Sequence, residues 1–125
     1  MTNSLALIIE DDPDLATIFA EALRGAEFKT EIIRDGKAAI NRLNTVIPSV
    51  VVLDLHLPFA SGKEILKHIR ADARLTDTRV ILATADSSLA DTLQAQVDLI
   101  LLKPISFGQL RNLAARLRPP DVVGE

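Results

Sequence analysis

Five short apolar runs, separated by stretches with a helical period, constrain the fold of this chain more than any other feature. The runs are Leu5–Ile9, Phe28–Ile33, Val50–Leu53, Val80–Ala83 and Leu99–Leu102. Four of them are apolar throughout, which is typical of strands buried on both faces of a parallel sheet. The second run is interrupted by Lys29, Thr30 and Glu31, which favours a strand at the edge of that sheet.

Between the runs, apolar side chains recur every three or four residues, as on one face of a helix. Each such stretch opens with a residue that can accept hydrogen bonds from free backbone amides: Asp12, Asp35, Ser61, Asp86 or a neighbouring serine, and Ser106. Gly25 should end the first helix, and the second should end before Pro48. Five alternations of strand and helix predict a doubly wound α/β sheet with helices on both faces.

The composition bounds what such a domain can do. With 125 residues, 48% of them hydrophobic, the chain can build one ordinary core. A formal net charge of −3 argues against broad attraction to nucleic acid or anionic membrane, and the absence of cysteine excludes disulfides and thiolate metal sites. No signal peptide or membrane span is evident. We therefore expect a soluble cytoplasmic protein, with one domain over residues 1–118 and a short mobile tail over 119–125.

Polar residues with complementary chemistry follow four of the predicted strands. They are Glu10-Asp11-Asp12, Asp54, Thr84 and Lys103-Pro104. In an open α/β sheet, the carboxyl ends of the strands line one functional edge. Clustered carboxylates repel one another unless a cation neutralises them, and hard oxygen ligands favour Mg²⁺. Because an ammonium and a hydroxyl suit the oxygens of a phosphoryl group, the set predicts an aspartyl-phosphate site with Asp54 as nucleophile.

Each of these residues has an ordinary interpretation when taken alone. Asp12 is best explained as a helix cap, and Asp54 by itself could be any carboxylate that follows a strand. Thr84 suits a strand in any case, and a lone lysine such as Lys103 is most often a solvated surface amine. The prediction therefore depends on all these groups occurring together, since separate strand ends would otherwise have to carry suitable groups by chance.

With those residues in place, the chain resembles the receiver domain of two-component response regulators over nearly its whole length. The segments that carry the resemblance are Leu7–Asp12, Val51–Pro58 followed by Gly62, Ile81–Ala85, and Lys103-Pro104. The segment around Asp54 is the most specific of them. The resemblance implies a flavodoxin-like fold, with a five-stranded parallel sheet in the order 2-1-3-4-5 and five helices.

The resemblance also implies a role for each site residue. Asp54 would accept the phosphoryl group and ligate the metal, which would be Mg²⁺ with Mn²⁺ as an alternative. The further metal ligands would be Asp11 directly, Glu10 through water, and the backbone carbonyl of His56. Thr84 would supply the switch hydroxyl and Lys103 would pair with the phosphate, with a cis peptide bond between Lys103 and Pro104.

The implied function is that of a stand-alone response regulator in a phosphorelay. It would accept the phosphoryl group from a sensor histidine kinase or histidine phosphotransfer protein. It would then signal by phosphorylation-dependent contact with an unknown protein, through the fourth helix, fifth strand and fifth helix. It would not be an enzyme beyond its own phosphoryl acceptance and hydrolysis, and would be a monomer or a weak homodimer, the latter through Leu99–Leu102.

The chain departs from the family pattern at Ile100, where the family often carries Tyr or Phe. Ile100 is either a changed switch element or a plain core residue. His56 and Asp86 could modulate the lifetime of the phosphoryl group, or be an idle side chain and a helix cap, and His68 should be solvated. A haloacid-dehalogenase-type phosphatase is disfavoured because His56 stands where that family has a second aspartate. A receiver-like interaction module that works without phosphorylation stays as the alternative.

Overall fold

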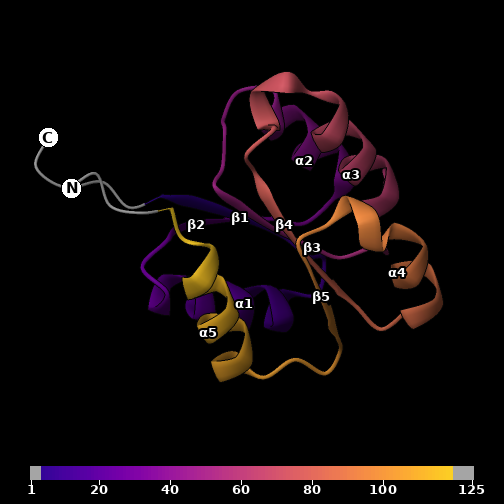
Figure 1. Cartoon of the computed structure of the whole chain (residues 1–125). Coiled ribbons are helices and arrows are strands. Elements are labelled where there is room, and N and C mark those ends of the chain that lie inside the picture. Colours follow the sequence, from indigo (N-terminus) through magenta and orange to yellow (C-terminus); the bar gives the residue numbers. More distant parts are fainter. Residues whose placement is uncertain (1–3, 120–125) are drawn as a thin grey trace, which may run out of the picture.

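A computed structural model of the chain describes residues 4–119, and it contains a five-stranded parallel sheet (Figure 1). The strands are β1 (Leu5–Ile9), β2 (Lys29–Ile33), β3 (Val50–Leu53), β4 (Arg79–Thr84) and β5 (Leu99–Leu102). They lie in the order β2-β1-β3-β4-β5, and every neighbouring pair is parallel. The flavodoxin-like fold and the strand order implied by the resemblance are confirmed.

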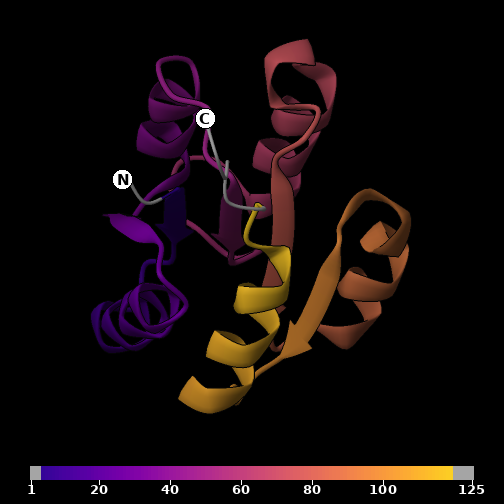
Figure 2. The same ribbon diagram turned by 60° about the vertical axis from the view of Figure 1, so that its left-hand side comes forward.

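Helices cover both faces of the sheet (Figures 1 and 2). They are α1 (Pro13–Gly25), α2 (Gly36–Leu43), α3 (Gly62–Ala71), α4 (Ser87–Leu93) and α5 (Phe107–Leu117), with short 3₁₀ turns η1 (Ala73–Leu75) and η2 (Gln94–Gln96). One core lies between the sheet and α1 with α5, and the other lies between the sheet and α2, α3 and α4. Within residues 4–119, none of the helices has the length and apolarity needed to cross a bilayer.

The predicted N-caps are confirmed at all five helices. In each, the side chain of the capping residue accepts a hydrogen bond from a backbone amide of the first turn: Asp12, Asp35, Ser61, Asp86 and Ser106. At α4 the cap is Asp86 rather than a neighbouring serine. Because a cap satisfies amides that have no partner inside the helix, these residues fix where each helix begins.

The predicted boundaries agree with the structure to within a few residues. The second strand begins at Lys29, one residue later than predicted, and Phe28 is buried ahead of it. Gly25 is the last residue of α1, but the left-handed conformation that follows the helix falls on Glu27 (φ 71°). The second helix ends at Leu43, well before Pro48, because residues 44–46 turn away in hydrogen bonds to the last helical turn.

The prediction that the run Leu99–Leu102 is buried on both faces was wrong. Within β5 only Leu101 is buried, and Leu102 is 50% exposed. The physical reason is position, since β5 is an edge strand that pairs only with β4. An apolar run therefore does not distinguish a central strand from an edge strand that helices cover in part. The expected tail over 119–125 lies outside the described residues except for Pro119.

Gly36, the first residue of α2, fixes the loop of residues 54–61 that joins β3 to α3. Its amide donates a hydrogen bond to the carbonyl of Pro58 (3.0 Å). A Cβ atom at this position would lie only 2.0 Å from the carbonyl oxygen of Ala60. The backbone of the loop therefore packs directly on the start of α2, where only glycine leaves enough room.

Replacing Gly36 with alanine should destabilise the protein by about 1–3 kcal/mol, because the loop must move to relieve the overlap. The measurement is the free energy of unfolding in urea. Gly108 is the matched control, since a Cβ there would meet no atom within 4 Å. Because Gly108 is the second residue of α5, Gly108→Ala should be neutral or stabilise by up to about 1 kcal/mol. Equal effects of the two substitutions would contradict this account of Gly36.

The edge strand β2 is tied to α2 by an ion pair between Glu31 and Arg42. Two hydrogen bonds join the guanidinium to the carboxylate, at 2.8 and 2.6 Å. The hydrogen bond from Arg42 is the main cause that lowers the pKa of Glu31 below its usual value. A lowered carboxyl pKa stabilises the folded state above the unfolded-state pKa, and this stabilisation is lost as the pH falls through the folded-state pKa.

Glu31→Gln should therefore be less stable than the wild type at pH 7, and the difference should shrink toward zero as the pH falls below about 4. Thermal unfolding midpoints measured from pH 7 down to pH 3 test this. Glu21→Gln, at an exposed position on α1, serves as the control and should follow the wild type throughout. A Glu31→Gln deficit that does not change with pH would rule out the ion pair as its cause.

Candidate functional site

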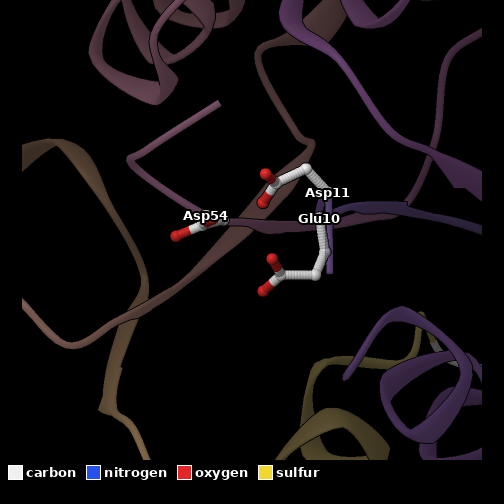
Figure 3. A group of neighbouring side chains, drawn as sticks. All are labelled: Glu10, Asp11 and Asp54. Atoms are coloured by element: carbon white, nitrogen blue, oxygen red, sulfur yellow. The ribbon is translucent and has the colours of Figure 1, made fainter. Parts of the chain in front are cut away.

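Three carboxylates gather at the carboxyl edge of the sheet (Figure 3). Glu10 and Asp11 follow β1, and Asp54 follows β3. Since Ile9 pairs with Leu53 in the neighbouring strand, the next residues of both strands emerge side by side. One carboxylate oxygen from each residue lies within 4.8 Å of the others. Figure 3 shows the carboxyl groups of Glu10 and Asp11 extending to the same side of the strand ends, where Asp54 lies.

The backbone around the carboxylates is held by the sheet and by one glycine. The amide of Asp54 donates to the carbonyl of Ile9, and the amide of Glu10 donates to Ile33, both at 3.0 Å. Gly62 packs against the backbone that follows β3, where a Cβ would lie 2.2 Å from the carbonyl oxygen of Asp54. Gly62 is therefore required by close packing against the backbone that carries Asp54.

Lys103 reaches the carboxylates from the end of β5. Its Nζ donates a hydrogen bond to Oε1 of Glu10 (2.7 Å) and lies 3.6 Å from Oδ1 of Asp54. Its backbone amide donates to the carbonyl of Thr84 (2.8 Å), and the peptide bond to Pro104 is cis. The structure thus brings together the predicted acidic residues and lysine, although they come from three different strand ends.

Negative charge exceeds positive charge at the site. Burial is the largest cause that raises the pKa of Glu10, and the charge of Asp54 adds to it, while the hydrogen bond from Lys103 opposes both. For Lys103, burial by itself would lower the pKa, but the hydrogen bond to Glu10 and the charges of Asp54 and Glu10 outweigh burial and raise it. One ammonium thus faces three carboxylates, two of them buried. This set of hard oxygen donors fits a divalent cation such as Mg²⁺.

Thr84 is fully buried at the end of β4, and its hydroxyl is tied to the start of α4. Its Oγ1 accepts a hydrogen bond from the amide of Asp86 (3.0 Å). Asp86 in turn caps α4 by accepting from the amide of Leu89 (2.9 Å), which confirms the interpretation of Asp86 as a cap. The predicted hydroxyl is therefore in the neighbourhood of the site, but its hydrogen bond connects it to α4.

His56 and Asp86 form a contact between two loops that the sequence did not reveal. Nε2 of His56 lies 3.6 Å from the free carboxylate oxygen of Asp86, and both side chains are partly solvent-exposed. The carboxylate of Asp86 thus faces the amide of Leu89 on one side and His56 on the other. No sequence signal predicts this pair, because 30 positions separate the two residues and neither belongs to a periodic pattern.

Two further residues were singled out in the sequence. Ile100 is half-buried and packs against the core beneath α2, α3 and α4. The prediction that His68 is solvated was wrong, because His68 is half-buried and its Nε2 is enclosed without a hydrogen-bond partner in the described part of the chain. The reason is its place on α3, three residues after Ile65 and directly before Ile69, at the border of the buried face.

Comparison with known proteins agrees with this geometry. The family model described as the response regulator receiver domain matches residues 6–115. The chain is 33% identical over 116 residues to the DNA-binding response regulator MtrA of Mycolicibacterium smegmatis, a match that covers 90% of this chain and 50% of MtrA. The chain thus spans about half the length of the first curated relatives it matches.

Two solved structures show the same fold. One is the receiver domain of the Francisella response regulator 1452, with a TM-score of 0.80, 27% identity, and coverage of 92% of this chain and 96% of that one. The other is the receiver domain of the sensor histidine kinase PA1611 of Pseudomonas aeruginosa, which has a magnesium ion coordinated in its active-site cleft. That structure has a TM-score of 0.82, 24% identity, and coverage of 93% and 98%. With this fold, this acidic edge and this family match, the chain belongs to the response regulator receiver domains.

Proposed function

We propose that this receiver domain accepts a phosphoryl group on Asp54 from a protein phosphohistidine. The observation that carries the proposal is the convergence of Glu10, Asp11, Asp54 and Lys103 at one edge of the sheet. A carboxylate oxygen of Asp54 attacks the phosphorus, and the P–N bond to the donor imidazole breaks. The imidazole nitrogen keeps the electron pair and takes up a proton. Lys103, whose Nζ lies 3.6 Å from Oδ1 of Asp54, neutralises charge on the transferred oxygens.

Asp11, Asp54 and the backbone carbonyl of His56 would hold the metal directly, and Glu10 would hold it through water. When bound, Mg²⁺ would supply positive charge that offsets the repulsion between the carboxylates and the phosphoryl group, and Mn²⁺ offers the same ligand chemistry. Support comes from the three carboxylates that gather around one ammonium at this edge of the sheet. The magnesium ion in the cleft of the PA1611 receiver domain provides an analogy.

The switch would run from Thr84 to α4 through Asp86. If the Thr84 hydroxyl turns toward the phosphoryl group, the amide of Asp86 loses its present acceptor. Because Asp86 caps α4, the start of that helix would shift, and the face formed by α4, β5 and α5 would change. This route needs no aromatic ring at Ile100. His56 and Asp86 would set the lifetime of the phosphoryl group from the rim of the site.

The partners follow from this chemistry. The phosphodonor is a sensor histidine kinase or a histidine phosphotransfer protein, and the output is contact with another protein, both in the cytoplasm. That the chain acts alone and without nucleic acid stays a prediction, since MtrA is a DNA-binding protein of about twice the length matched here. A weak homodimer would use the exposed edge at Leu102.

Incubation with acetyl phosphate and Mg²⁺ should add the mass of one phosphoryl group to the wild type, as measured by intact-mass spectrometry. Asp54→Asn should add none, because the nucleophilic carboxylate is gone. Asp14→Asn is the matched control, since Asp14 is an exposed aspartate outside the site, and it should behave like the wild type. A wild type that gains no mass would favour the interaction module that works without phosphorylation.

Mg²⁺ should raise the thermal unfolding midpoint, because one divalent cation neutralises the clustered carboxylates. At a 100-fold excess over Kd the stabilisation is about 2.7 kcal/mol. Asp11→Asn should be at least as stable as the wild type without metal, because a repulsive charge is removed, and should lose most of the response. NaCl at matched ionic strength controls for screening. An Asp11→Asn variant with the full response would refute this ligand set.

A further inference from the structure

The loop of residues 54–61 carries an exposed aromatic side chain on a strained backbone. Phe59 has a φ of 70°, in the left-handed region that favours glycine, and its side chain is 86% exposed. A phenylalanine normally adds to stability by being buried. Here the ring is in water and the backbone conformation is unfavourable, so folding alone does not explain the residue. A strained residue beside a functional site is a reason to look for a role in function.

Phe59 is held in place by the loop around it. The amides of Gly36 and Ala60 both donate to the carbonyl of Pro58, at 3.0 and 2.9 Å. Ala60 packs so closely on Gly36 that no side chain fits at that glycine. The backbone on both sides of Phe59 is therefore fixed against α2, and a partner that binds the ring has little loop motion to suppress.

The ring forms one wall of a hollow of about 350 Å³ at the start of α2. The other lining residues are Asp35, Lys37, Ala38 and Asn41. One carboxylate oxygen of Asp35 already accepts the amide of Ala38 as the cap of α2, whereas Lys37 is exposed at the surface. The hollow therefore suits an apolar side chain with an acidic neighbour, the first against Phe59 and the second near Lys37.

We propose that Phe59 and this hollow bind the protein that delivers the phosphoryl group to Asp54. The inference rests on the proposed function. A protein donor must bring its phosphohistidine up to Asp54, so it must cover the loops around that residue. Phe59 lies in the loop that starts at Asp54 and closes beside it, where the amide of Gly62 donates to the carbonyl of Leu55 (2.9 Å). The output face is elsewhere, since α2 lies on the other side of α3 from α4 (Figures 1 and 2). A partner that binds α4 and β5 would not need to contact Phe59.

The test compares a protein donor with a small one. The histidine kinases and phosphotransfer proteins of the source organism are purified and phosphorylated, and the one with the fastest transfer to the wild type is the probe. Phe59→Gly should lower kcat/KM for this transfer by about tenfold or more, as removal of an aromatic anchor does at interfaces. Its rate with acetyl phosphate should be unchanged, because that donor needs no docking surface.

The controls separate docking from folding. Glycine adopts the left-handed conformation without strain, so the unfolding midpoint of Phe59→Gly should stay within a few degrees of the wild type. Ile47→Ala removes another exposed hydrophobic side chain, 60% exposed, ahead of β3 at the opposite end of the sheet, and should transfer like the wild type. Lys37→Glu should slow the protein donor and leave acetyl phosphate unaffected.

Two results would overturn the docking proposal while leaving the proposed function intact. One is a Phe59→Gly variant that accepts the phosphoryl group from the protein donor as fast as the wild type. The other is a Phe59→Gly variant that slows as much with acetyl phosphate as with the protein donor, because the ring would then act on the site itself. If no protein donor of the panel phosphorylates Asp54, the proposed function itself fails, and the docking proposal falls with it.

Discussion

The hydrogen bond between Lys103 and Glu10 is the contact on which the site depends. It joins residues 93 positions apart at 2.7 Å and places the ammonium 3.6 Å from Asp54. Buried carboxylates without a counter-charge are strongly unfavourable, and a lysine in their midst reduces that penalty without removing it. The remaining negative charge is what makes the edge of the sheet receptive to a divalent cation. The same contact makes the ends of β1 and β5 parts of one site, although two strands separate them in the sheet.

The site has a rigid part, formed by the parallel sheet, and an adjustable part, formed by the start of α4. The strands hold the backbone of Glu10 and Asp54 through their ladder, and Gly62 packs against the carbonyl of Asp54. The link to α4 is of a different kind, because a single hydrogen bond joins the Thr84 hydroxyl to the amide of Asp86. A contact of this sort can be exchanged for another acceptor with little rearrangement of the core. This arrangement offers a coupling route in a domain that has Ile100 in place of an aromatic residue.

Much of the fold could be predicted because its determinants are local. A capping side chain acts within its own first turn, so Asp12 and Ser61 could be identified from spacing alone and were confirmed. The two burial predictions that failed share one cause. Leu102 and His68 each follow a local pattern, but their exposure depends on which elements pack beside them. No local pattern contains that information.

By itself, the sequence determined the type and order of the elements and the chemical group at the end of each strand, since periodicity, caps and strand-end residues are properties of short segments. Only the tertiary structure decided that Lys103 bonds Glu10, that His56 faces Asp86, and that Phe59 is exposed in a left-handed conformation. Such contacts join loops from different strand ends. They are set by the register of the sheet and by the packing of Gly36 against the loop, which no single segment encodes.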